Sequence, residues 1–112
     1  MTHTMNLWHD PFEKIVSGQK SVEMRLYDEK RQKIHAGDTI IFTDVDTGQT
    51  VACKVVNMRT FATFDKLYLH YDKTAIGYDK NEQANPKDML AYYTQAQIDA
   101  YGVAAIEIKV LS

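Results

Sequence analysis

The feature that most constrains this sequence is a strict alternation of residue types between positions 21 and 27. The apolar positions are Val22, Met24 and Leu26, and the residues that alternate with them are Ser21, Glu23, Arg25 and Tyr27. Successive side chains of a β-strand point to opposite faces, so this spacing predicts a strand with one face in a core and one polar face. Lys20 directly precedes the strand, and Gly18 is expected to end a short helix before it. The segment therefore gathers an ammonium, a carboxylate and a guanidinium.

Strand signals recur along the chain. We expect strands near residues 5–8, 39–43, 50–59 and 103–111, with residues 44–48 forming the loop of a hairpin. These strands are not separated by regular crossover helices, which argues against a doubly wound parallel sheet. The pattern predicts an α+β fold, a small and mostly antiparallel β-barrel with short helices on its outside.

The first helix has a clear start signal. Asp10 is predicted as its N-cap, with Pro11 at the first helical position and Glu13 completing a capping box. The apolar stripe that would dock this helix consists of Phe12, Ile15 and Val16. Further short helices are expected from Thr63, from Asn85 to Tyr92, and over residues 94–100 before Gly102.

Length and composition narrow the class of protein. The 112 residues, 45% hydrophobic and 25% charged, predict a single domain over 1–112 with ordinary globular composition. The single cysteine, Cys53, lies in an apolar strand pattern, so we expect it to be buried, without a disulfide. No run is long enough to span a membrane and no signal peptide is visible, so the expected location is the cytoplasm. The four histidines show no metal-ligand spacing, and no cofactor is predicted.

Charge is distributed unevenly. The net charge of −2 argues against unspecific binding to long nucleic acids, which requires a densely positive surface. Between Lys14 and Lys33, however, six basic residues stand against three acidic ones. Such a local basic patch suits a small anionic ligand or a short stretch of RNA, although an internally paired, solvated surface is an equally good interpretation.

The run from Pro11 to Arg25, followed by Ile34-His35-Ala36-Gly37-Asp38, resembles the ASCH domain family. The family pattern is glycine-x-lysine-x-x-glutamate-x-arginine followed by a Gly-Asp pair, and it is matched at Gly18, Lys20, Glu23, Arg25, Gly37 and Asp38. The resemblance covers most of the chain and implies a PUA-like β-barrel fold. It also implies, by analogy within the family, a link to RNA recognition.

One branch of that family is an N(4)-acetylcytidine amidohydrolase that uses a lysine, a threonine and a glutamate. The resemblance places its lysine at Lys20. Its threonine falls at Glu23, which has no hydroxyl to attack an amide, and its glutamate falls near Ala75, where the closest acids are Asp72 and Asp79. Two of the three roles are therefore unfilled in this chain.

These observations lead to a ranked set of hypotheses. The first is a domain that binds RNA or a small nucleotide- or nucleoside-like ligand in a cleft formed by Lys20, Glu23 and Arg25, with Ser21 and Trp8 on its wall. The second is a small amidohydrolase acting on a modified nucleoside, with Lys20 and Glu23 as catalytic residues. The third is a protein-interaction domain. Trp8 and Tyr27 are candidates for stacking on a base, and a simple ion pair between Glu23 and Arg25 remains the structural alternative.

Overall fold

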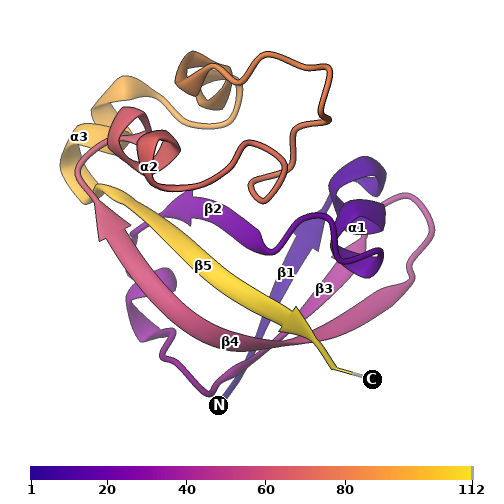
Figure 1. The fold of residues 1–112 in the computed structure, drawn as a ribbon. Helices are drawn as coiled ribbons and strands as arrows, with labels where there is room; N and C mark the ends of the chain where they lie inside the picture. Colours follow the sequence, from indigo (N-terminus) through magenta and orange to yellow (C-terminus); the bar gives the residue numbers. More distant parts are fainter. Residues whose placement is uncertain (112) are drawn as a thin grey trace.

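The computed structural model describes residues 1–111 and contains one five-stranded sheet with short helices (Figure 1). The strands are β1 (Thr2–Leu7), β2 (Val22–Leu26), β3 (Thr39–Asp44), β4 (Thr50–Phe61) and β5 (Val103–Val110). The helices are α1 (His9–Val16), α2 (Phe64–His70) and α3 (Gln95–Tyr101), and the 3₁₀ turns are η1 (Arg31–Lys33) and η2 (Pro86–Ala91). All five predicted strands are present.

The sheet has the order β1-β3-β4-β5-β2. Only the β1–β3 pair is parallel, and the other three pairs are antiparallel. The long strand β4 has an irregular register between Val55 and Asn57, where a bulge increases local twist. The sheet curls into a half-barrel, which confirms the predicted α+β class. The end strands β1 and β2 are bridged by a side chain, since the Arg25 Nη2 donates to the Asn6 carbonyl oxygen at 2.8 Å.

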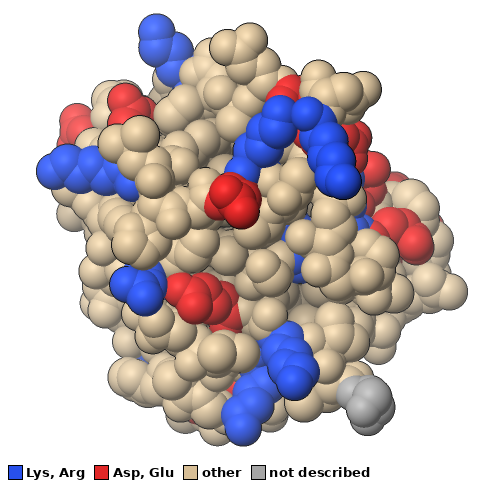
Figure 2. Space-filling model, in the orientation of Figure 1, with Lys and Arg blue, Asp and Glu red and all other residues tan. Residues whose placement is uncertain are grey.

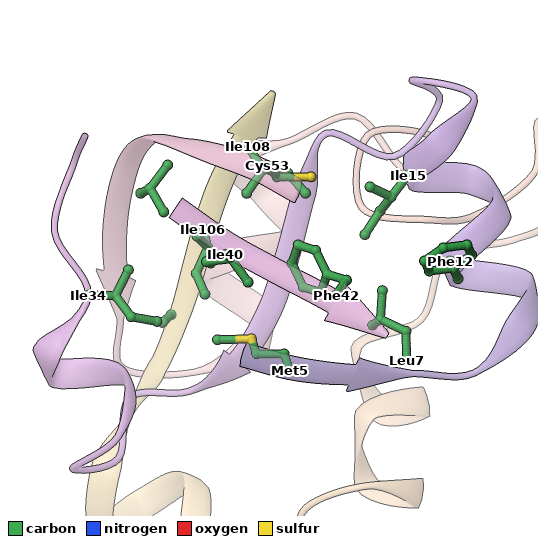
Figure 3. Packing of buried hydrophobic residues seen from close by; sticks show 12 residues of the cluster. Met5, Leu7, Phe12, Ile15, Ile34, Ile40, Phe42, Cys53, Ile106 and Ile108 are labelled. Carbon is green, nitrogen blue, oxygen red and sulfur yellow. The ribbon is translucent and has the colours of Figure 1, made fainter. Parts of the chain in front are cut away.

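Two apolar cores lie on opposite faces of the sheet. The first core fills the curl beneath α1, as Figure 3 shows, and includes Phe12, Ile15, Phe42 and Cys53. The second core lies between the β2–β5 pair and the helices α2, η2 and α3, and includes Leu67. The strand β5 serves both: Ala104, Ile106 and Ile108 face the first core, whereas Val103 and Ala105 face the second. The predicted apolar face of β2 packs in the second core, and Cys53 is buried as expected.

The start of α1 differs from the prediction. The helix begins at His9 with Trp8 at its N-cap, so Asp10 lies inside the first turn and does not cap the helix. Pro11 is tolerated there because the first N–H groups of a helix have no intrahelical partner. The Asp10 carboxylate instead lies 3.1 Å from Lys14 Nζ. Val16 was expected in the docking stripe but ends the helix on its solvent side and is half exposed.

The later helices mostly follow their sequence signals. Thr63 caps α2, and Thr94 caps α3 with the reciprocal bond from Gln97 that defines a capping box. The short helix expected after Asn85 is the 3₁₀ helix η2, and the Asn85 side chain caps it by accepting from the Lys87 N–H. None of the helices within residues 1–111 has the length and apolarity needed to cross a membrane.

Candidate ligand-binding cleft

A cleft of about 590 Å³ opens where β1 runs into α1. Its other walls are β2 and the loop segment that follows α2, including residues 76–79 and 88–93. The volume falls within the roughly 300–1,000 Å³ of small-molecule sites. The cleft therefore lies where the two end strands of the half-barrel approach each other.

The floor of the cleft is an ion-paired trio, with two residues on the polar side of β2 and one just before the strand. Glu23 accepts from Lys20 Nζ through one carboxylate oxygen and from Arg25 Nε through the other, both at 2.7 Å. Glu23 is only 2% exposed and Lys20 only 8%. We call these three residues the floor trio. It forms because the alternation of β2 sends Glu23 and Arg25 to the same face, away from the second core.

The floor trio fixes the charge of its carboxylate. Burial alone would raise the pKa of Glu23, but the adjacent charges and hydrogen bonds of Lys20 and Arg25 outweigh burial, so its pKa lies below the ordinary value. Glu23 is therefore ionised at neutral pH, and the trio has a net charge of +1. Lys20 has N–H donors beyond the one that Glu23 occupies, as does the Arg25 guanidinium, so the floor offers donors to an oxygen of a ligand.

Lys14 of α1 reaches across the cleft to the facing loop. Its Nζ donates to the Gly77 carbonyl oxygen at 2.8 Å and lies 3.4 Å from an Asp79 carboxylate oxygen. Burial lowers the pKa of Lys14, but the pairing with Asp10 and Asp79 outweighs it and raises the pKa. Gln19 adds a second tie, since its side-chain amide donates to the Tyr78 carbonyl oxygen at 3.2 Å.

Aromatic side chains form the walls. These residues are Trp8, Tyr68, Tyr78, Tyr92 and Tyr93. Trp8 is 62% exposed and Tyr92 is 61% exposed, so both offer ring surface to a ligand. Tyr68 and Tyr78 are fixed by a hydrogen bond of 2.9 Å between their hydroxyls, and Tyr78 also donates to an Asp88 carboxylate oxygen at 2.7 Å.

Four of the five predicted site residues meet in this cleft: Trp8, Lys20, Glu23 and Arg25. Ser21 does not line it. Its side chain is exposed, and its backbone N–H and carbonyl are taken up by Ala75 and Ile108. Tyr27, the second stacking candidate, is also outside the cleft, because it packs against the first core.

Sequence reasoning missed the part of the cleft that comes from the second half of the chain. From the sequence, Asp79 is named only through the family resemblance, and none of the lining tyrosines Tyr68, Tyr78, Tyr92 and Tyr93 is named as a site residue. The available signal was the density of tyrosines between positions 68 and 93. That signal does not tell which rings face a cavity, because this depends on how a loop without regular structure crosses the sheet.

The local basic patch of residues 14–33 does not form one surface. Lys14, Lys20 and Arg25 face the cleft, whereas Arg31 and Lys33 lie in η1, which Figure 1 places at the opposite end of β1 from α1. Arg31 is itself paired with Asp28 at 3.0 Å. Figure 2 shows acidic and basic side chains interspersed over the visible face. Within residues 1–111, no group of His, Cys, Asp and Glu side chains is arranged to hold a metal ion.

In a comparison with protein families, the ASCH domain model matches residues 5–112. The chain belongs to the ASCH domain family. Two solved structures share its fold along nearly the whole chain. The crystal structure of hypothetical protein PH0355 has a TM-score of 0.84 and 30% identity, covering 99% of this chain and 100% of the other. The solution NMR structure of protein PF0455 from Pyrococcus furiosus has a TM-score of 0.78 and 28% identity, covering 100% and 99%. No curated protein matches the sequence.

In this ASCH domain, the residues of the matched pattern have distinct structural roles. Gly18 adopts a φ of +85° and allows the chain to leave α1. The three residues that follow it lead into β2, so that Lys20, Glu23 and Arg25 form the cleft floor. Gly37 and Asp38 are far from the cleft: Asp38 accepts from the His35 N–H at 3.0 Å and contacts the His3 ring at 2.9 Å, which stabilises the turn before β3.

Proposed function

We propose that this ASCH domain binds a nucleoside, or an unpaired base of RNA, in the cleft above the floor trio. The observation that carries the proposal is the combination of exposed aromatic rings with buried, pre-positioned donors in one cavity. Unpaired bases are commonly recognised by stacking on aromatic side chains together with hydrogen bonds to their edges. Trp8 and Tyr92 supply ring surface, and Lys20 and Arg25 supply donors for a carbonyl oxygen of a base.

The rigidity of the floor supports a binding role. Lys20 and Arg25 are held by the same carboxylate, and Arg25 is held again by the Asn6 carbonyl oxygen. Donors fixed before the ligand arrives lose little conformational freedom on binding, which favours affinity. The floor trio therefore does more than neutralise charge on the sheet.

Binding can be measured with the protein's own fluorescence, because Trp8 is the only tryptophan and lines the cleft. Titration with the four ribonucleosides and with short single-stranded oligoribonucleotides should give a saturable change in Trp8 emission for at least one of them. Tyr92→Ala should weaken binding by about 1–3 kcal/mol, the usual value of stacking on one ring. Tyr101→Ala is the matched control, since Tyr101 is partly exposed but lies outside the cleft. Equal losses in both variants, or no saturable signal with any of these ligands, would refute the proposal.

Hydrolysis of N(4)-acetylcytidine is the second candidate, because Lys20 lies in a cleft beside a carboxylate. The geometry supports it less well. Both oxygens of Glu23 are occupied and its pKa is lowered, which makes it a weak general base. The hydroxyls that line the described cleft are phenolic, and Ser21 lies outside.

Chromatography of N(4)-acetylcytidine incubated with the protein separates the two functions. We expect saturable binding without release of cytidine. Cytidine formation that disappears in Lys20→Ala would establish the amidohydrolase instead.

A further inference from the structure

The charges around the cleft are arranged in two zones. At the floor, Lys20 and Arg25 outnumber Glu23. Nearer the solvent, four further carboxylates line the cleft: Asp10, Asp79, Glu82 and Asp88. We call these four residues the acidic rim. With Lys14 included, three cationic and five anionic side chains line the cleft, which leaves a formal charge of −2.

The acidic rim is exposed and partly held in place. The side chains of Asp10 and Asp79 are 80% and 53% exposed. Glu82 accepts from the Asp79 N–H at 2.7 Å, and Asp88 accepts from the Tyr78 hydroxyl at 2.7 Å. These contacts keep negative charge at the mouth of the cleft, where the outer part of a ligand would lie.

The cations that could neutralise a phosphate are already paired. Lys14 contacts both Asp10 and Asp79, and Lys20 and Arg25 share Glu23. When the edge of the base takes the floor donors, a 5′-phosphate at the outer end of the ligand lies against the acidic rim, and juxtaposed like charges in a cleft are strongly unfavourable. An uncharged ring with carbonyl oxygens meets no such penalty and finds donors at the floor.

We infer that the acidic rim determines specificity: it admits an uncharged nucleoside and rejects the same molecule with a 5′-phosphate. The inference rests on the proposed function, since it concerns the ligand of the same cleft. Of the two ligand classes in the proposed function, the inference favours a free nucleoside. It disfavours an RNA strand, because the phosphates of the strand would flank the bound base.

The test compares affinities for cytidine, uridine, adenosine and guanosine with those for their 5′-mono- and 5′-triphosphates, measured by Trp8 fluorescence at low salt. For the best-bound nucleoside, the monophosphate should bind at least about tenfold more weakly and the triphosphate more weakly still. The difference should shrink as salt screens the exposed rim.

The triple variant Asp79→Asn, Glu82→Gln, Asp88→Asn should reduce the nucleoside-to-monophosphate ratio to below about threefold. The matched control is Asp65→Asn, Asp72→Asn, Asp99→Asn, which changes the net charge equally at exposed positions outside the cleft and should leave the wild-type ratio. If the triple variant is poorly folded by circular dichroism, Asp79→Asn alone should still reduce the ratio, because the Asp79 carboxylate contacts only Lys14 at 3.4 Å.

The outcomes are distinct. Failure of every nucleoside, nucleotide and short oligoribonucleotide to bind refutes the proposed function and the inference together. Binding of an oligoribonucleotide but of no nucleoside overturns the inference and leaves the proposed function standing. Nucleoside binding with an equal or tighter monophosphate overturns the inference and leaves the proposed function standing. A control triple that reduces the ratio as much as the rim variant also overturns it, since net charge would then be the cause.

Discussion

Glu23 is the residue on which the cleft depends most. A carboxylate that is 2% exposed is stable only because two cations contact it at 2.7 Å. Its position in β2, paired with Ile106 of β5, couples the chemistry of the floor to the integrity of the sheet. The two cations that pair with Glu23 also have second roles. Arg25 bridges to β1 through the Asn6 carbonyl oxygen. The aliphatic part of Lys20 packs against Gly77, where an added Cβ would lie 3.3 Å from Lys20 Cδ.

Glu23→Gln should therefore destabilise the protein strongly. Removing one member of a buried ionic cluster leaves uncompensated charge, which typically costs about 3–5 kcal/mol. Urea denaturation would measure this, with Glu107→Gln as the control. Glu107 pairs with a half-exposed Arg59 and accepts from the Tyr71 hydroxyl at 2.7 Å. Because a glutamine keeps an oxygen that can accept from Tyr71, this change should cost no more than about 1 kcal/mol. Comparable small losses in both variants would show that the floor trio is not tightly coupled.

Asp38 gives a prediction for pH dependence. Contacts with the His3 ring and the His35 N–H lower the pKa of Asp38 from 3.8 to about 2. A carboxyl group with a lowered folded-state pKa stabilises the fold above its unfolded pKa and loses that contribution as pH falls through the folded value. Asp38→Asn should therefore be less stable than wild type at neutral pH, and the difference should shrink between pH 3.8 and about 2. Thermal melts across that range, with Asp65→Asn as reference, measure it; a constant difference would contradict the assignment.

At the scale of the elements, the connection from α3 to β5 places a strong restriction on which residue can stand at position 102. Gly102 ends α3 with φ +70° and ψ −171°, a region that is nearly exclusive to glycine. A Cβ at this position would lie 3.0 Å from the Phe61 carbonyl oxygen. The Gly102 carbonyl oxygen also accepts from the Tyr27 N–H at 3.0 Å, so this turn aligns β5 with the end of β2.

Gly102→Ala should cost about 1–3 kcal/mol of unfolding free energy because of the strained backbone, and the close contact adds to it. Gly48→Ala is the matched control: its φ is +77°, but a Cβ added there would have no atom within 4 Å. The difference between the two variants in chemical denaturation measures what the Gly102 site adds through its ψ of −171° and its contact with Phe61. Equal costs would mean that the contact relaxes freely.

At the scale of the whole molecule, the cleft is a consequence of a half-barrel whose end strands approach without forming a ladder. The sequence predicted every strand, because β-branched and apolar patterns with clear turns are local signals. It also predicted the floor trio, because its three residues lie on one short segment. It did not predict that the trio is buried, nor which tyrosines face it, since both depend on contacts between β2 and residues more than 40 positions away.

The prediction of a local basic patch over residues 14–33 is wrong for a related reason. Proximity in sequence does not place residues on one surface when a strand lies between them. β2 and the turn after it carry Arg31 and Lys33 away from Lys14. The cleft cations pair with Asp10 and Glu23 nearby in sequence and with Asp79 from the loop after α2. The basic segment of the sequence thus contributes three cations to a cleft whose mouth is lined by the acidic rim.

The most direct test of the central claim, that this cleft is the ligand site, is mapping of backbone amide chemical shifts by NMR while the best-bound nucleoside is added. We predict shifts concentrated at residues 20–25, 77–79 and 92–93, and at the Trp8 indole N–H. The end of the β4–β5 pair near Lys54 and Lys109 should be unaffected. Shifts centred on that remote end, or binding without any shift in residues 20–25, would contradict the account.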